Sequence, residues 1–216
     1  MPCILMINPN TSSATTAAMK KIAEHYCPQD LHVEGKTAPF GAPLITEPQQ
    51  LEIAAAAVGD VMRASRDAYD GFIIAAFGDP GLEALRPNFS QPLVGIAAAS
   101  IAEAARGGRS FSIVTTTPAL KEHIVMRCHK TGYGENFKSI RFTETDAAAL
   151  CERPGQLFDE LTEAVRKAID LDGAEAVIIG GGPLATAARH MQKEFNIPII
   201  EPIKSAVLKI SCELGL

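Results

Sequence analysis

The chain has 216 residues, enough for one large domain or for two small lobes that share a core. Its net charge of -5 offers no basic footprint for a nucleic acid, and its five scattered cysteines form no CxxC pair of the kind found in zinc knuckles. No apolar run approaches a membrane span and no signal peptide is recognisable, so we expect a cytoplasmic protein.

Short, unbroken apolar runs alternate with helical patterns along the first half, which is typical of βαβ units and a mostly parallel sheet. In chain order, strands are expected at residues 3–7, 31–36, 71–77 and 92–96. Helices are expected at 14–26 and 49–65, as a short segment after the turn at 78–81, and at 97–106. A loop rich in proline and glycine separates the second strand from the second helix.

The same order of elements returns in the second half. Strands are expected at 111–114, 139–142, 176–179 and 197–201, and helices from 118 to about 131, at 154–171, at 185–195 and at 204–214. The likeness of 72–80 to 177–183, and of 91–95 to 197–201, indicates a duplicated unit, although any two βα units share some features. We expect one compact two-lobed unit, with residues 1–96 and the helix near 203–216 in the first lobe and 97–202 in the second.

Four strand ends carry small, polar or glycine-rich turns, two in each half at matching places. Because ligands lie outside the carboxyl ends of parallel strands, we expect these turns to line one cleft between the halves. Their hydroxyls, backbone N–H groups and helix N-termini suit a carboxylate, an amide or a urea-like group. The candidate substrate-binding residues are Asn8, Asn10, Thr11, Ser12, Phe77, Gly78, Thr115, Thr116, Thr117, Gly181 and Gly182.

Each of these turns also has a purely structural interpretation. Residues 8–12 and 115–117 are rich in the side chains that cap helix N-termini, and the glycines at 180–182 suit a tight turn. The glycines form neither a phosphate loop, since no Gly-Lys-Ser/Thr follows, nor a G-x-G-x-x-G fingerprint. Asp79 could cap the helix that follows it.

Two motifs together resemble a known family. The Asn-Pro-Asn-Thr turn after the first strand resembles the opening of the aspartate/glutamate/hydantoin racemases, and Phe-Gly-Asp-Pro-Gly-Leu at 77–82 resembles their hydantoin and allantoin branch. The likeness covers nearly the whole chain. It implies an α/β fold of two pseudo-symmetric, flavodoxin-like halves, each a mostly parallel sheet flanked by helices with the site between them. It also implies a small-molecule substrate and no cofactor or metal, and we expect a homo-oligomer without nucleic-acid or membrane partners.

The resemblance implies a mechanism in which two cysteines, one from each half, face each other across the substrate's α-carbon. Inversion needs an acid and a base on opposite faces, which such a pair supplies. The matching positions here are Ala76 and Gly181, and neither side chain carries a proton. None of the five cysteines falls at a strand end facing the expected cleft, since Cys3 lies at the wrong end of its strand. Two-thiol racemisation is therefore not expected.

Three hypotheses remain open. The first is a divergent enzyme of this fold, an isomerase, lyase or ring-opening enzyme for a small carboxylate or cyclic amide, with other proton carriers. The candidate catalytic residues are then Asp79, His123 and Glu201, besides the threonine hydroxyls at 115–117. The second is a true hydantoin-type racemase, and the third is a non-catalytic protein that binds a small ligand.

Overall fold

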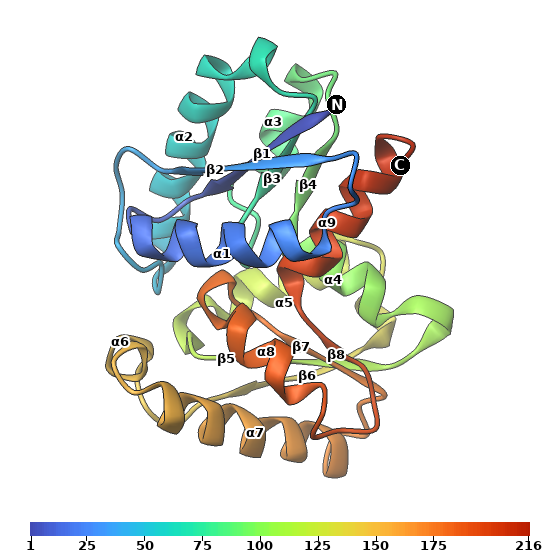
Figure 1. Ribbon diagram of the computed structural model, residues 1–216. Helices are drawn as coiled ribbons and strands as arrows, with labels where there is room; N and C mark the ends of the chain where they lie inside the picture. Colours follow the sequence, from blue (N-terminus) through green and yellow to red (C-terminus); the bar gives the residue numbers. More distant parts are fainter.

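The first half of the chain forms a four-stranded parallel sheet (Figure 1). The computed structural model describes residues 1–216. Its first four strands are β1 (Cys3–Asn8), β2 (His32–Thr37), β3 (Gly71–Ile74) and β4 (Leu93–Gly95), in the order β2-β1-β3-β4. The helices of this half are α1 (Ser13–Tyr26), α2 (Pro48–Ala64), α3 (Leu82–Leu85) and α4 (Ile96–Ala104).

The second half repeats this arrangement. Its strands are β5 (Phe111–Thr115), β6 (Phe137–Phe142), β7 (Ala176–Ile179) and β8 (Ile199–Ile200), all parallel and ordered β6-β5-β7-β8. Its helices are α5 (Lys121–Lys130), α6 (Ala147–Cys151), α7 (Pro154–Asp170), α8 (Ala185–Met191) and α9 (Pro202–Glu213). The equal strand orders confirm the predicted α/β fold of two similar halves.

The two central strands of each sheet are buried on both faces, which explains their mostly apolar sequences. In β1, Ile4 and Met6 point to one face and pack with α1, whereas Leu5 and Ile7 point to the other and pack with α2. The two long helices of the first half begin at side-chain caps. The Ser12 side chain accepts from the backbone of Thr15, and Glu47 and Gln50 form a capping box at the start of α2.

The last helix returns to the first half of the chain. Ile203, Ala206, Val207 and Ile210 of α9 pack in the same hydrophobic cluster as Ile4 of β1. Figure 1 shows α9 leaving the lower sheet and running up beside the upper one. The chain therefore crosses between the halves twice, once through α4 and once through α9.

Some elements differ from those expected from the sequence, among them the strand expected at 197–201, which is limited to Ile199–Ile200. The strand expected at 71–77 ends at Ile74, because the chain turns away at Ala75 to form the loop that carries Phe77 and Asp79. The helix expected at 185–195 ends at Met191. The helix α6 was not expected at all, since five residues are too short to show a helical period.

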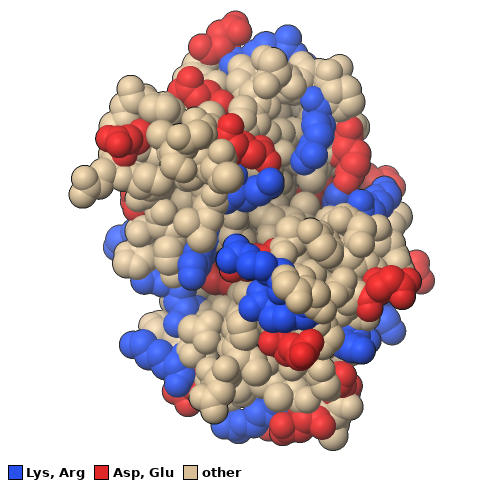
Figure 2. All heavy atoms as spheres, turned by 90° about the vertical axis from the view of Figure 1, so that its right-hand side faces the viewer, with Lys and Arg blue, Asp and Glu red and all other residues tan.

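No helix in the structure combines the length and the apolar character that a membrane span requires. Figure 2 shows the side of the molecule that carries the end of α9, where basic and acidic side chains lie next to one another. This face therefore offers no extended surface of a single charge.

Candidate functional site

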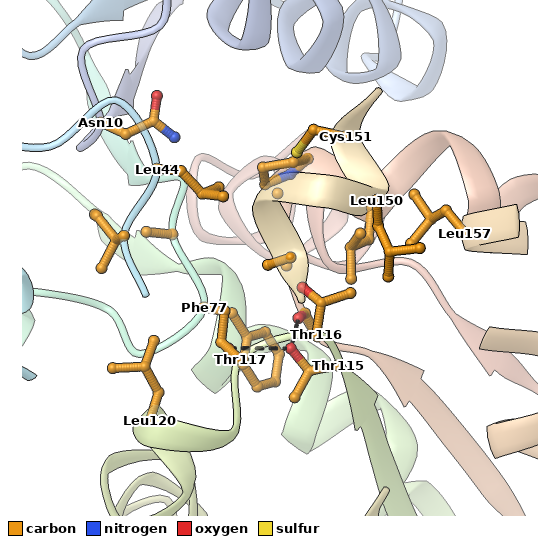
Figure 3. Close-up of a pocket in the computed structure, with 18 of the residues that line it drawn as sticks. Asn10, Leu44, Phe77, Thr115, Thr116, Thr117, Leu120, Leu150, Cys151 and Leu157 are labelled. Atoms are coloured by element: carbon orange, nitrogen blue, oxygen red, sulfur yellow. Dashed lines mark hydrogen bonds between the residues drawn. The ribbon is translucent and has the colours of Figure 1, made fainter. Parts of the chain in front are cut away.

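A cavity lies where the carboxyl ends of β1, β3, β5 and β7 approach one another (Figure 3). The cavity is small, with an enclosed volume of about 70 Å³, and it is partly open to solvent. Each of the four predicted turns contributes to its wall, through Asn10, Phe77, Thr115–Thr117 and Gly180–Pro183. Leu44, Ile45, Leu120, Leu150, Leu157 and Leu184 complete a mostly apolar lining together with small residues.

The predicted binding residues divide into two sets. Asn10, Phe77, Thr115, Thr116, Thr117, Gly181 and Gly182 line the cavity. Asn8, Thr11, Ser12 and Gly78 do not. The second set instead holds the turns in shape, as the hydrogen bonds of Asn8 and Ser12 illustrate.

Asn8 organises the first turn from a fully buried position. Its amide nitrogen donates to Asn10 Oδ1 at 2.8 Å and to Thr16 Oγ1 at 2.9 Å, and its oxygen accepts from the Asn10 backbone at 3.2 Å. Asn10 Oδ1 also accepts from the backbone of Ser12. The Asn10 amide nitrogen has no partner in the protein, and Figure 3 shows it directed toward the cavity, so it is available to an acceptor on a ligand.

The threonine turn joins two strands of the second sheet. Thr115 Oγ1 donates to the carbonyl of Gly180 at 2.6 Å, which ties the end of β5 to the end of β7. The Thr117 hydroxyl lies 3.4 Å from that of Thr115 and makes no capping bond to the helical turn that follows. The capping interpretation of these threonines is thus wrong, and Thr116 and Thr117 face a space that a ligand can occupy.

The triple-glycine turn packs closely against the first half. A Cβ on Gly182 would lie 2.5 Å from Met19 Sδ and 2.9 Å from the Ala75 carbonyl oxygen. A Cβ on Gly180 would approach the Phe77 ring to 3.1 Å. Glycine is therefore required here by the close approach of the two halves, in addition to the turn itself.

Several residues of the cavity wall have backbone donors without a partner. The N–H groups of Ala76, Phe77, Thr116, Thr117 and Gly181 donate no hydrogen bond within the protein. All five residues belong to the cavity wall. Backbone N–H groups that meet at a concave surface bind carboxylate and carbonyl oxygens. The wall is thus suited to a ligand with such oxygens.

Asp79 faces away from the cavity. It is fully buried at a positive φ of 50°, and its carboxylate accepts from the backbone of Ala97 at 2.9 Å and of Ala98 at 2.8 Å. It thereby caps α4, and not the short helix directly after it. Burial raises the pKa of Asp79 to about 6, although Arg127 and the two N–H groups oppose this.

Arg127, from α5 of the second half, covers the Asp79 loop. Its guanidinium donates to the carbonyls of Gly78 at 2.8 Å and Asp79 at 3.2 Å, and it pairs with Glu83. Its Nε also lies 3.7 Å from the Asp79 carboxylate. Arg127 therefore clamps the first-half loop to the second half.

The other two candidate proton carriers also lie outside the cavity wall. Glu201 caps α9 by accepting from the backbone of Ile203 at 2.7 Å and of Lys204 at 2.8 Å, and burial raises its pKa to about 7. The side chain of His123 borders a separate depression beside Asp79 and Arg127, and its buried Nδ1 has no hydrogen-bond partner. The structure thus brings none of the three to the turns that form the cavity.

Cys151 is a wall residue that sequence reasoning missed. It ends α6, and Figure 3 shows it beside Leu150 at the cavity. Among the lining side chains it is the only one of a type that titrates near neutral pH or binds metals. Partial burial, together with Asp146 and Glu152, raises the pKa of this thiol, so it is protonated at neutral pH.

Both positions matched to the family cysteines lie in the cavity wall. Ala76 follows β3 and Gly181 follows β7, each two residues after the last strand residue. Gly181 has a φ of 157°, a conformation that other residues rarely adopt, and a Cβ there would lie 3.1 Å from Leu184 Cγ. A cysteine at this position is therefore strained in the present backbone.

Comparison with known proteins agrees with this geometry. The family model described as Asp/Glu/Hydantoin racemase matches residues 4–210. The chain belongs to this family. It is 30% identical over 206 residues to a hydantoin racemase of Paenarthrobacter aurescens, covering 94% of this chain and 87% of that protein. An allantoin racemase from Klebsiella pneumoniae superposes with a TM-score of 0.93 at 31% identity, covering 100% of this chain and 89% of that one.

More distant members of the fold include other kinds of enzyme. An arylmalonate decarboxylase has a TM-score of 0.69 at 13% identity, and it covers 99% of this chain and 93% of its own. A maleate cis-trans isomerase of Nocardia farcinica has a TM-score of 0.72 at 16% identity, and the match covers 100% of this chain and 93% of the isomerase chain. At these identities the likeness concerns the fold alone, and reaction chemistry must be argued from the side chains of each site.

Proposed function

We propose that this chain binds a small cyclic amide or carboxylate in the cavity between its halves. The observation that carries the proposal is that wall residues from both halves have backbone N–H groups with no partner in the protein. A carbonyl or carboxylate oxygen at Thr116 and Thr117 would accept from donors of the second half. The N–H groups of Ala76 and Phe77 and the Asn10 amide would serve oxygens on the side of the first half.

The remaining wall selects the size and polarity of the ligand. Leu44, Ile45, Leu120 and Leu150 surround the polar turns with aliphatic surface. A compact ring with exocyclic oxygens satisfies both kinds of surface, because its edge can accept hydrogen bonds while its faces contact leucine and isoleucine. Hydantoin-like rings, with two carbonyl groups, have this character. The likeness to a hydantoin racemase and an allantoin racemase supports the same ligand class.

We further propose that the chain does not invert the ligand by two-thiol chemistry. Inversion needs proton carriers on both faces of the α-carbon. Ala76 and Gly181 carry none, and Cys151 is the one titratable side chain of the wall. Asp79 and Glu201 would have to leave the helix ends that they cap in order to reach the ligand, so their catalytic roles remain hypotheses without geometric support.

The test is a calorimetric titration with hydantoin, allantoin and 5-substituted hydantoins, paired with NMR of the α-proton in deuterium oxide. We expect saturable binding of at least one ring and no α-proton exchange above the rate without protein. Ala76→Leu should abolish binding, because the larger side chain would fill the cavity. Ala56→Leu, at an exposed position of α2, should leave binding unchanged. Absence of binding by every ring would refute the ligand class, and rapid exchange would refute the absence of racemisation.

One observation favours a second function, a lyase that uses a single proton donor. The Cys151 thiol is protonated and borders the cavity. In a decarboxylation the C–C bond to the departing carboxylate breaks and carbon dioxide leaves. The electron pair remains on the α-carbon and delocalises onto the other carboxylate, which the N–H groups would stabilise. Cys151 would then protonate the carbon, and solvent would return the proton to the thiolate.

This second function is tested with a substituted malonate as the probe. Turnover should release carbon dioxide and should fall at least about 100-fold in Cys151→Ser, because a hydroxyl is a far weaker acid than a thiol. Cys212→Ser changes an exposed cysteine of α9 and should leave the rate unchanged. Equal rates in the two variants, or no release of carbon dioxide by the unmodified chain, would rule this function out while leaving ligand binding untouched.

A further inference from the structure

A cluster of three different metal-binding side chains lies far from the cavity. Cys3 begins β1, and His32 and Glu34 belong to β2, so all three stand near the amino ends of the first sheet. One potential ligand atom from each, the cysteine sulfur, an imidazole nitrogen and a carboxylate oxygen, lies within 4.8 Å of the other two. The cavity is at the opposite, carboxyl end of the same strands.

Strand pairing explains why these residues meet. Cys3 and His32 are direct partners in the parallel register of β1 and β2, so their side chains leave the same face of the sheet. Glu34 follows His32 by two residues and therefore shares that face. The side chains of His32 and Glu34 are exposed and Cys3 is half-buried, so an ion from solvent can reach all three.

Neighbouring groups hold the cluster in place. The Tyr69 hydroxyl donates to Glu34 Oε2 at 2.5 Å and leaves the other carboxylate oxygen available. Asp70 Oδ2 accepts from the backbone N–H of Cys3 at 2.7 Å, which anchors the start of β1 and adds a negative charge beside the site. Hydrogen bonds that orient the ligands in this way are a regular feature of metal sites.

We propose that Cys3, His32 and Glu34 form a zinc site with water in a fourth, open position. Sulfur, imidazole nitrogen and carboxylate oxygen are the three ligand types that Zn²⁺ uses in proteins. Ligand atoms of a tetrahedral zinc lie roughly 3.3–3.8 Å apart, so small rotations of the exposed His32 and Glu34 side chains complete the geometry. The Cys3 thiol releases its proton to solvent as the sulfur binds, and the ion joins the edge strand β2 to β1.

The experiment is a titration of the full metal-free chain with Co²⁺ followed by Zn²⁺. Co²⁺ should produce the near-ultraviolet thiolate-to-cobalt absorption and the visible bands of a tetrahedral site, and one equivalent of Zn²⁺ should bleach them. His32→Ala and Glu34→Gln alter exposed side chains and should each weaken Zn²⁺ binding at least about 10-fold. Cys3→Ser should remove the thiolate band.

Cys212→Ser is the matched control, because it removes an exposed cysteine outside the cluster and should keep both the band and the Zn²⁺ affinity. Thermal melting of the metal-free variants establishes that each is folded. The proposal is overturned if Zn²⁺ binds no more tightly to the unmodified chain than to His32→Ala and Glu34→Gln. It is equally overturned if the thiolate band survives in Cys3→Ser, since another cysteine would then bind the metal.

Discussion

The two halves of the molecule place a buried carboxylate at corresponding helix ends by different routes. In the first half, Asp79 reaches from the loop after β3 to the N-terminus of α4, where Gly95 occupies the cap position. In the second half, Glu201 occupies the cap position of α9 itself. Glu201 matches Gly95 in the sequence repeat, and each is the cap residue of the helix that follows it.

This exchange shows that the helix end, and not a particular residue, requires the carboxylate. The first N–H groups of a helix have no partner within it, and at α4 and α9 they are buried. A Cβ on Gly95 would lie 2.2 Å from Asp79 Cγ. Because the Asp79 carboxylate occupies this space, the cap position of α4 has no room for a side chain. Where Glu201 supplies the group at the cap position itself, the loop after β7 provides no carboxylate to that helix end.

The largest effect that tests this comparison is expected for Gly95→Ala. The added methyl group would occupy the space of the Asp79 carboxylate, so either the carboxylate leaves its two N–H partners or the helix shifts. We expect a loss of about 4 kcal/mol in the free energy of unfolding, measured by urea denaturation. Gly155→Ala, at an open position of α7, is the control.

A double substitution sharpens the same test. Asp79→Gly suits the positive φ of 50° at that position, and Gly95 has extended dihedral angles close to those of Glu201. Gly95→Glu combined with Asp79→Gly would therefore give the first half the arrangement of the second. The double variant should recover most of the stability that Gly95→Ala loses. If it is no more stable than Gly95→Ala, the correspondence between the two helix ends is wrong.

The next effect is a dependence of stability on pH. Burial raises the pKa of Asp79 from 3.8 to about 6, so the folded protein binds this proton more tightly than the unfolded chain. The stabilisation is fully present below about pH 4 and is lost as the pH rises through 6. The difference between a pKa of 3.8 and one of about 6 corresponds to a change on the order of 3 kcal/mol in stability. The contribution of Glu201 to stability depends on pH in the same direction, because its pKa in the folded protein is raised to about 7.

Urea denaturation of Asp79→Asn between pH 4 and 7 measures this contribution. The variant should lose less stability than the unmodified chain as the pH rises, whatever the cost of its imperfect cap. Asp30→Asn alters an exposed aspartate and should keep the original profile. Parallel profiles for Asp79→Asn and the unmodified chain would contradict the raised pKa.

A smaller effect is expected from Arg127, which has no counterpart at Glu201. Arg127 contacts the Asp79 loop from the second half, whereas the carboxylate of Glu201 has no ion pair within salt-bridge distance. Arg127→Met should lower the free energy of unfolding by about 2 kcal/mol, because two carbonyl groups lose a charged donor. It should also raise the pKa of Asp79 further without affecting that of Glu201. NMR titration of the two carboxyl carbons distinguishes these outcomes, and equal shifts would show that the effect is not local.

Much of the fold was predictable because the strands, turns and helices of each half have sequence patterns that are visible over a few consecutive residues. The buried strands β1 and β7 have unbroken apolar runs, β5 is interrupted only by Ser112, and the duplicated order of elements predicted two similar sheets. The end of β3 was not predictable in this way. Ala75, Ala76 and Phe77 continue the apolar run, but they turn into the cavity wall, where apolar residues are also buried.

The site was predictable only where it consists of turns at strand ends. Cys151 was not predicted as a site residue, because its short helix lies between a strand and a long helix and no motif marks it. The Cys3, His32 and Glu34 cluster depends on the register between β1 and β2, which no sequence spacing contains. Asp79 was a catalytic candidate because a charged residue after a strand suits chemistry, but its contacts are those of a cap.

The smallest expected effect concerns the missing thiols. Ala76 and Gly181 occupy matching places in the two halves, and both line the cavity. Ala76→Cys combined with Gly181→Cys should therefore produce weak but measurable α-proton exchange in a bound hydantoin, as followed by NMR in deuterium oxide. Each single variant should do much less, because one thiol can remove a proton but cannot return one to the opposite face.

The exchange is expected to stay weak for a reason specific to the second half. Gly181 has a φ of 157°, and a side chain there would press on Leu184, so the turn must relax and its thiol will be poorly placed. Replacing Leu184 by alanine in the double variant should therefore increase the exchange rate, provided that thermal melting shows a folded protein. If the triple variant is folded and binds the ring but is no faster than Ala76→Cys alone, then positions 76 and 181 do not face each other across the ligand.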